Sequence, residues 1–354
     1  MPLTLTPEHS AAIDAAIWKI YRSKLGGGEL AQLAKLFARG ELLKQLETIL
    51  APTLRHGRYY REELEIKLAW IDKRPLAKLA NHSKRVELGD AAFFFFEQLA
   101  NHGVSIPQYG RALIMQAKVA KDMNQIASPS VPVNPVRPSP DSSTARELDL
   151  LSKWDTFDLY ATSGSRDAIV TGISVAPASL PPAHGWYMAT PRRHPAGSQA
   201  SAWKSPWMCA PAEAGVACAF TLGEVLRSFF AFSYAAPMGN LPVEVGANID
   251  PDPSNLQNPS GQGWERLGVE LLRLCPKNQL PRSLFGNVAS RSAMGSSVVR
   301  SFPYLGLGGN GTGLLSRIYQ RLFGRRMPVL VVVFIKTEGD LSNPTSARIN
   351  RERE

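Results

Sequence analysis

The first 125 residues alternate between helix-like and strand-like patterns of apolar positions. Apolar residues recur every three or four positions over 7–21, 29–50 and 60–72, which predicts three amphipathic helices. The stretches 85–96 and 111–120 are instead almost continuously apolar or aromatic, as in strands buried within a sheet. A polar segment with glycine and proline separates these two strands and fits a turn. We therefore expect an α/β region that begins with a helical part.

Prolines mark the chain after these two strands. Residues 127–143 hold five prolines, four of them spaced three positions apart, which predicts an extended loop of polyproline II type. Residues 144–154 then predict a helix with Ser143 or Thr144 as its N-cap, and residues 156–162 predict a strand. The proline segment is therefore interpreted as a long loop inside one domain.

Beyond residue 163 glycine, proline, serine and tryptophan become frequent, and the periodicity weakens. Helices are still predicted at 223–232 and 264–274, and residues 327–335 predict a buried strand. A chain of 354 residues is long enough for two domains. We expect four segments: a helical extension at 1–57, an α/β domain at 58–162, an α+β accessory domain at 163–337 and a flexible tail at 338–354.

Positive charge is concentrated in the accessory domain. The net charge of the chain is +10, and residues 271–337 contain ten Lys and Arg but no Asp or Glu. Eight of the ten are Arg, whose guanidinium group suits phosphate oxygens. We therefore favour nucleic acid as the partner over a basic face that only meets solvent. The candidate nucleic-acid contacts are Arg291, Arg300, Arg317, Arg321, Arg325 and Arg326.

Several classes of protein lack their signatures in this chain. The longest clean apolar run, residues 329–335, is far shorter than the roughly 20 residues of a membrane-spanning helix. No CxxC pair and no HxxxH pair is present, which argues against a disulfide framework and a zinc site. Glycine-rich residues 306–313, which precede an expected helix at 314–323, lack the Gly-Lys-Ser/Thr of a P-loop. No signal peptide is recognisable, so we expect a cytoplasmic protein without a membrane partner.

Three polar residues interrupt the two apolar strands. Asp90 lies where a polar segment enters the first strand, and Gln116 and Lys118, two positions apart in the second, share one face of it. A lysine there is costly to bury unless it is paired, and Asp90 on the neighbouring strand would be its partner. The alternative is that these residues cap a turn or face solvent on a half-exposed strand.

Together the three residues suit metal-assisted hydrolysis of a phosphodiester. Asp90 and the side-chain carbonyl of Gln116 would offer hard oxygen ligands to Mg²⁺, for which Mn²⁺ is expected to substitute. Lys118 would orient the attacking water or help to deprotonate it, and would offset charge on the scissile phosphate. The ion would polarise a phosphate oxygen and lower the pKa of water.

A strand that carries Asp, followed by a strand with Gln-x-Lys, resembles the PD-(D/E)XK nuclease superfamily, and the Gln-x-Lys form is similar to its Mrr-type enzymes. The resemblance covers residues 58–162. It implies the restriction-endonuclease-like fold, a mixed sheet flanked by helices in the order α-β-β-β-α-β, with a short first strand within 75–80. It also implies Mg²⁺-dependent cleavage of DNA by Asp90, Gln116 and Lys118, in defence against foreign phage DNA.

The resemblance adds candidates and shows departures. Members often add a glutamate from the preceding helix, and Glu65 lies nearest the buried edge of the helix expected at 60–72; it becomes a further catalytic and metal-binding candidate. Glu87 joins only if a bulge at Gly89 turns it toward Asp90. Gly89 stands where the family has proline, and Gln116 replaces the usual acid, which removes one negative charge from the metal site.

Two interpretations of function follow. The first is a metal-dependent endonuclease that cuts DNA, as a homodimer or with a partner defence subunit, with RNA open as an alternative substrate. The second is a catalytically inactive nucleic-acid-binding or assembly subunit of a larger complex, in which the basic segment faces nucleic acid or protein. Divalent-metal binding that depends on Asp90 would separate the two.

Overall fold

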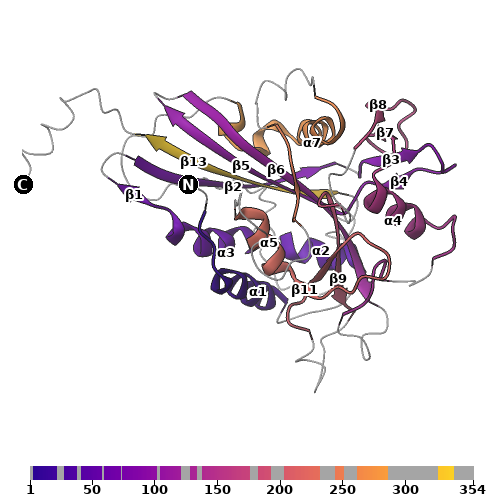
Figure 1. The fold of residues 1–354 in the computed structure, drawn as a ribbon, viewed down its shortest axis with the longest axis horizontal. Coiled ribbons are helices and arrows are strands. Elements are labelled where there is room, and N and C mark those ends of the chain that lie inside the picture. The colour runs from indigo at the N-terminus through magenta and orange to yellow at the C-terminus, as the bar shows by residue number, and fades with distance from the viewer. Residues whose placement is uncertain are drawn as a thin grey trace, which may run out of the picture.

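The computed structural model describes residues 3–21, 28–37, 41–57, 60–72, 74–101, 104–120, 128–133, 138–175, 182–192, 203–231, 244–250, 261–285 and 326–338. The protein is mixed α/β, with a mixed central sheet flanked by helices (Figure 1). Among the described residues, no helix is long and apolar enough to cross a membrane.

The central sheet has nine strands in the order β1-β2-β13-β5-β6-β9-β10-β11, with β12 paired to β6. Strand β13 runs antiparallel to β2 and parallel to β5; β5 and β6 form an antiparallel hairpin, and β9 runs parallel to β6. The strands are β1 (His56–Gly57), β2 (Tyr60–Ile71), β5 (Ala91–Asn101), β6 (Val104–Ala120), β9 (Gly185–Pro191), β10 (Met208–Pro211), β11 (Phe220–Thr221), β12 (Ala247–Asn248) and β13 (Met327–Glu338).

A smaller antiparallel sheet lies beside the catalytic candidates. Its order is β4-β3-β7-β8, and it is built from β3 (Leu76–Leu79), β4 (Val86–Glu87), β7 (Phe157–Tyr160) and β8 (Val170–Ile173). Strand β3 lies within 75–80 and β7 lies inside the strand expected at 156–162. Both belong to this smaller sheet, however, and not to the sheet of β5 and β6 in which the resemblance placed them.

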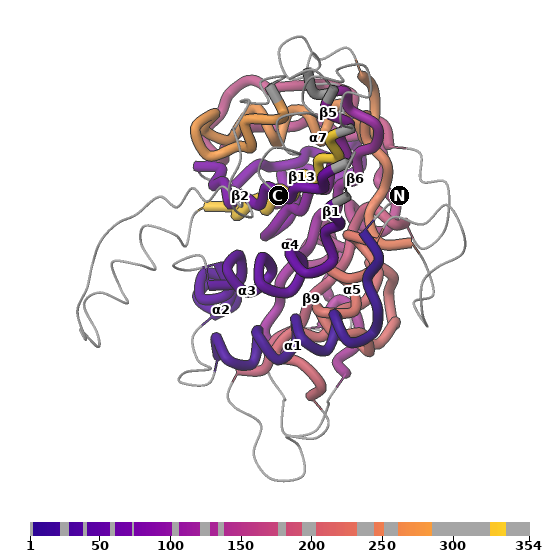
Figure 2. Tube along the Cα trace, turned by 90° about the vertical axis from the view of Figure 1, so that its left-hand side faces the viewer, coloured from indigo at the N-terminus to yellow at the C-terminus, as the bar shows by residue number. Residues whose placement is uncertain are grey.

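Two apolar cores cover opposite faces of the central sheet. Helices α1 (Pro7–Tyr21), α2 (Glu29–Phe37), α3 (Glu41–Leu50) and α5 (Leu222–Phe230) pack on one face. Helices α4 (Ser143–Lys153) and α7 (Gly263–Leu274) belong to the core on the other face. Figure 2 shows the first four helices gathered on the side of the sheet away from α7.

The helix expected at 60–72 is wrong, because this segment is strand β2. Leu64, Ile66 and Leu68 alternate in one core, while Glu65 and Lys67 point to the opposite face. Two charged residues on a buried face mimic the polar side of an amphipathic helix. The helix expected at 29–50 is two helices, α2 and α3, on either side of residues 38–40, which lie outside the described residues.

Other expectations are confirmed with small shifts. Helices α1, α5 and α7 and strand β13 lie where the sequence predicted them. Helix α4 spans the segment expected at 144–154, but its N-cap is Ser142, whose hydroxyl accepts the Ala145 N–H. The single strand expected at 85–96 is two strands, β4 and β5, that belong to different sheets.

The central sheet joins segments that were expected to form separate domains. Strands β2, β5 and β6 come from residues 58–162, whereas β9 and β13 come from residues 163–337, and β13 lies between β2 and β5. The boundary expected at 162 therefore falls inside one hydrogen-bonded sheet. Glu338 ends β13; the remainder of the expected tail, the glycine-rich residues 306–313 and the helix expected at 314–323 lie outside the described residues.

Candidate functional site

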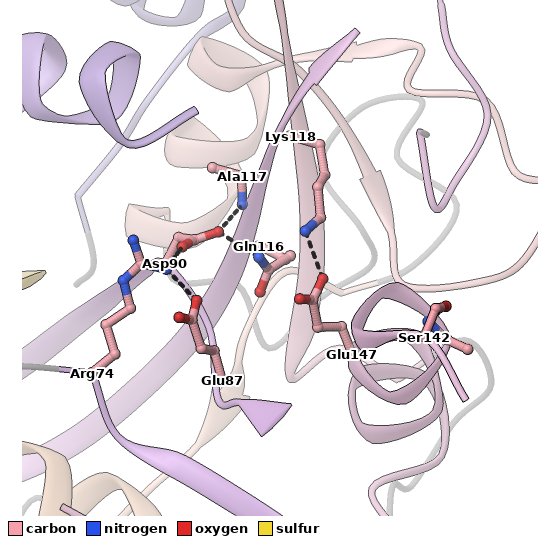
Figure 3. Close-up of polar contacts among 9 residues, drawn as sticks. Arg74, Glu87, Asp90, Gln116, Ala117, Lys118, Ser142 and Glu147 are labelled. Carbon is pink, nitrogen blue, oxygen red and sulfur yellow. Dashed lines mark hydrogen bonds and ion pairs between the residues drawn. The ribbon is translucent and has the colours of Figure 1, made fainter. Parts of the chain in front are cut away.

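The hairpin of β5 and β6 brings Asp90 and Gln116 together. Ala91 pairs with Met115, and the N–H of Asp90 donates to the Met115 carbonyl at 2.9 Å. One carboxylate oxygen of Asp90, Oδ2, accepts hydrogen bonds from the Gln116 side-chain amide and from the Ala117 N–H, the latter at 2.9 Å (Figure 3). Both side chains are buried at the point where the central sheet meets the smaller one.

Gly89 allows the chain to reach this position. A Cβ atom at residue 89 would lie 2.4 Å from Cγ2 of Ile114 and 3.3 Å from the Met115 carbonyl oxygen. Only a residue without a side chain lets the segment between β4 and β5 pass so close to β6. This explains in steric terms why glycine stands directly before the aspartate.

The ion-pair partner of Lys118 lies on α4, whereas we expected Asp90, directly before β5, to be its partner. Its ammonium lies 2.6 Å from Oε2 of Glu147, and both side chains are largely buried. Glu147 was not among the candidates that the strand pattern indicated. Its signal was helical spacing: Glu147 lies three and four positions before Leu150 and Leu151, which makes it part of the inner face of α4.

Asp90 is paired instead with Arg74, from the loop between β2 and β3. Nη1 of Arg74 lies 3.1 Å from Asp90 Oδ1 and also contacts the Glu87 carboxylate (Figure 3). Glu87, on β4, thus joins the site through Arg74 and not through a bulged strand. The loop is held in place because Leu88 N–H donates to the Pro75 carbonyl at 3.0 Å, which extends the pairing of β3 with β4.

Burial and charge shift the ionisation of this cluster. Burial raises the pKa of Asp90 to about 7, an effect that Arg74 opposes and Glu29 reinforces. Burial alone would lower the pKa of Lys118, but the carboxylates of Glu147, Glu29 and Asp90 raise it above its ordinary value. Lys118 is therefore a cation at neutral pH.

Four buried polar atoms of the cluster make no hydrogen bond: Asp90 Oδ1, Glu147 Oε2, Gln116 Oε1 and the Tyr187 hydroxyl. The first two are in ion pairs with Arg74 and Lys118. Tyr187 is the register partner of Gln116 on β9. Burial raises the pKa of its hydroxyl, with the Glu147 and Asp90 carboxylates adding to the shift. Buried polar atoms normally have partners, so Gln116 Oε1 and the Tyr187 hydroxyl have capacity for a further ligand.

The donor set fits a hard divalent cation in part. Among the described residues, no group of three or more His, Cys, Asp and Glu is placed to hold a metal ion. Mg²⁺, however, usually takes one or two protein oxygens and completes its ligands with water and substrate phosphate. Asp90 Oδ1 and Gln116 Oε1 are two such oxygens.

Glu65 does not join the site. It lies on β2 opposite Val333, which pairs with Phe96, six residues beyond Asp90 and hence about 20 Å along the sheet. Its carboxylate accepts from Ser283 Oγ at 2.9 Å and lies 3.9 Å from the Lys67 ammonium. The prediction of Glu65 as a catalytic and metal-binding residue is therefore wrong; it anchors the turn at Arg282–Phe285 to the sheet.

Of the predicted nucleic-acid contacts, only Arg326 lies among the described residues. Its Nε is 3.1 Å from Asp72 Oδ1, directly before β13. Because Val329 pairs with Ala92, the start of β13 is level with Asp90. Arg291, Arg300, Arg317, Arg321 and Arg325 lie outside the described residues.

The cluster therefore combines the buried Asp90 carboxylate, the Gln116 amide oxygen and the ion-paired Lys118 ammonium where the two sheets meet. Such a set can bind a cation and neutralise a phosphate. Comparison with models of protein families, with curated proteins and with solved structures finds no match for this chain. No family membership is assigned to it on that basis.

Proposed function

We propose that the protein is a metal-dependent nuclease that hydrolyses phosphodiester bonds of DNA at Asp90, Gln116 and Lys118. The observation that carries this proposal is the meeting of these three side chains at one end of the β5–β6 hairpin, where Gln116 Oε1 is buried without a hydrogen-bond partner beside the Asp90 carboxylate. Polar atoms that are buried without partners are disfavoured unless a ligand uses them.

The arrangement around the hairpin supports a restriction-endonuclease-like fold as part of this proposal. The Asp-bearing strand β5 is antiparallel to β6, and the chain passes through α4 before β9 joins β6 in parallel. Three features depart from the pattern that the resemblance implies: the segment expected as the first helix is strand β2, β13 lies between β2 and β5, and the strands expected within 75–80 and at 156–162 belong to the smaller sheet.

Each residue has a defined task. Asp90 Oδ1 and Gln116 Oε1 would hold Mg²⁺, and when bound this ion supplies Lewis-acid stabilisation of the charge on the phosphate. Lys118, kept protonated by Glu147, faces the same cluster and offsets negative charge on the scissile phosphate or donates a proton. The raised pKa of Lys118 argues against its use as a base that deprotonates water.

A nucleic acid is the substrate that the charge distribution favours. Within the acid-free segment 271–337, Arg326 lies directly before β13, whose start is level with Asp90. A phosphate contact at Arg326 would therefore lie beside the site. The proposal includes a cytoplasmic role in defence against foreign DNA, as a homodimer or with a partner subunit, for which the support is the resemblance of residues 58–162.

A catalytically inactive nucleic-acid-binding or assembly subunit is the second candidate. It is favoured by the charge state of the site, since Gln116 adds no negative charge and both Asp90 and Lys118 already have ion-pair partners. A protein that had kept the fold but lost the chemistry would keep such internal pairs.

Cleavage of supercoiled plasmid in Mg²⁺ or Mn²⁺, against EDTA, tests the proposal. We expect Asp90→Asn and Lys118→Met to reduce the rate by at least about 100-fold. Lys67→Met is the matched control, because it removes another buried, ion-paired lysine from the same face of the sheet. Unfolding transitions of all variants show whether they fold.

Metal-dependent cutting that is lost in both site variants and kept in Lys67→Met supports the nuclease. DNA binding without cutting supports the inactive subunit. Cutting that survives Lys118→Met contradicts the assigned site.

A further inference from the structure

The two carboxylate oxygens of Asp90 are used differently. Oδ2 accepts both hydrogen bonds that come from β6, one from the Gln116 amide and one from the Ala117 N–H. Oδ1 accepts none and faces Nη1 of Arg74 at 3.1 Å. The oxygen that a divalent cation would use is therefore the one that Arg74 now neutralises.

Arg74 stands between the buried acid and solvent. Its guanidinium bridges Asp90, whose side chain is fully buried, and Glu87, whose side chain is 38 % exposed. The Arg74 side chain itself is 10 % exposed. It comes from a loop and not from a regular strand, so it can change partners without breaking the central sheet.

The charges of the cluster do not cancel. Four carboxylates act on one another here, those of Glu29, Glu87, Asp90 and Glu147, against the two cations Arg74 and Lys118. When all are ionised, two negative charges remain, which matches one divalent cation. With the cation bound, these charges cancel, and Asp90 has the cation beside it in place of Arg74, whose guanidinium is then available to another anion.

We propose that Arg74 is a phosphate-binding residue of this site, which holds Asp90 in the free protein and exchanges that partner for a DNA phosphate. A guanidinium group forms paired, charge-assisted hydrogen bonds with phosphate as readily as with carboxylate. The exchange frees Asp90 Oδ1 for the divalent cation. This inference rests on the proposed metal site and adds to it a coupling between DNA and metal.

The coupling is reciprocal. If DNA draws Arg74 away from Asp90, DNA tightens the binding of the cation, and the cation tightens the binding of DNA by the same factor. The cluster then binds the cation more weakly when no DNA phosphate is present.

The test measures Mn²⁺ binding, by calorimetry and by the electron paramagnetic resonance signal of free Mn²⁺. In the absence of DNA, we expect Arg74→Met to bind Mn²⁺ about tenfold more tightly than the unmodified protein, because a competing charge has gone. Arg55→Met is the matched control. Arg55 also pairs with a buried carboxylate on β2, that of Glu62, but at the far end of the strand.

A second arm adds a 20-base-pair duplex, in a Lys118→Met background so that the DNA stays intact. Where Arg74 is present, the duplex should tighten Mn²⁺ binding about tenfold, and Mn²⁺ should tighten duplex binding equally. In Arg74→Met, duplex binding should weaken severalfold and the coupling factor should fall toward one. Arg74→Lys should keep part of the DNA affinity, because it keeps the charge but not the fork.

Three results overturn the inference: Mn²⁺ affinity that Arg74→Met leaves unchanged or weakens, an equal rise in Arg55→Met, or a coupling factor that does not depend on Arg74. These are distinct from failure of the proposed function. Mn²⁺ binding that rises in Arg74→Met, is lost in Arg74→Met/Asp90→Asn and is coupled to the duplex only where Arg74 is present upholds the inference even if no variant cuts DNA. Metal-dependent cutting with unchanged Mn²⁺ affinity upholds the nuclease alone.

Discussion

Arg74 and Glu147 are the counter-ions of the two charged residues that the sequence pattern singled out. Strand spacing is local, so Asp90, Gln116 and Lys118 could be placed on one site from the sequence. Their counter-ions come from segments outside these two strands: Arg74 from the loop before β3 and Glu147 from helix α4. A buried charge requires such a partner, but the sequence of the strand that carries the charge does not identify that partner.

The buried His184 makes stability depend on pH. Its ring lies 4.6 Å from that of Trp264 and 5.9 Å from that of Trp154, and burial lowers its pKa to about 4 from an ordinary 6.5. The unfolded chain therefore binds the proton more tightly. The contribution of His184 to stability is full above pH 6.5 and is lost as the pH falls to 4, a change of about 3 kcal/mol.

Urea unfolding at pH 7.5 and pH 4.5 measures this loss. In His184→Phe the decrease in unfolding free energy between the two pH values should be smaller by that amount. His56→Gln, which changes an exposed histidine, should decrease as the unmodified protein does. An identical decrease in His184→Phe contradicts the prediction.

Gly89→Ala should damage the site through sterics alone. The new Cβ would meet Cγ2 of Ile114 at 2.4 Å, so β5 or β6 must shift at Asp90. We expect a loss of about 1–3 kcal/mol in unfolding free energy, together with weaker Mn²⁺ binding. Ile114→Ala removes Cγ2, so the double variant should lose less unfolding free energy than the sum of the two single losses and should recover part of the Mn²⁺ binding. Gly164→Ala, where the nearest atom is 3.9 Å away, should change neither.

At the scale of elements, the sequence placed α1, α4, α5, α7 and β13 well, and misplaced β2. Residues 64–68 alternate strictly between apolar and charged side chains, yet Leu64, Leu68 and Ile71 also satisfy helical spacing. The decision between the two depends on what covers Glu65 and Lys67. They pair with each other under the turn at Arg282–Phe285, a contact that crosses more than 200 residues. Local periodicity contains no information about such a cover.

Helix α4 is attached to the sheet by a buried ion pair, and breaking either half should be costly. We expect Glu147→Leu or Lys118→Met alone to lower the unfolding free energy by about 3 kcal/mol, because each leaves a buried charge unpaired. The double variant should lose about 2 kcal/mol less unfolding free energy than the sum of the two single losses, which is the coupling energy of the double-mutant cycle.

The same cycle on Glu41 and Lys44 of α3 is the control. That pair has 44 % and 41 % exposed side chains, and should show a coupling of only about 0.5 kcal/mol. Equal couplings for the two pairs would mean that the Glu147–Lys118 pair is not shielded from water.

At the scale of the whole molecule, the position of β13 determines which parts of the chain share one sheet. It pairs with β2 over its entire length and with β5 over most of it, so it joins residues more than 200 positions apart. The sequence predicted that 327–335 is a buried strand, but it did not predict which strands pair with it. The pattern of a fully apolar strand does not specify its pairing partners. The expected domain boundary failed to anticipate this shared sheet for that reason.

The fragment 58–162 should therefore not fold alone. It lacks β13 and β9, which leaves β2 without its long partner and exposes one edge of β5 and of β6. A chain ending at residue 338 keeps every paired residue of β13 and should unfold cooperatively on heating, as followed by circular dichroism. A chain ending at residue 326 should not. A cooperative transition in the isolated fragment would contradict this view of the sheet.

The place of β13 also sets an order of events during synthesis on the ribosome. The hairpin that carries Asp90 and Gln116 emerges early, but its neighbour in the middle of the sheet emerges more than 200 residues later. Until then β5 has an open edge and Asp72 has no Arg326 to meet. A nascent chain thus cannot complete the sheet behind its charged cluster. The sheet that carries the charged cluster is therefore complete only after residues 327–338 have left the ribosome.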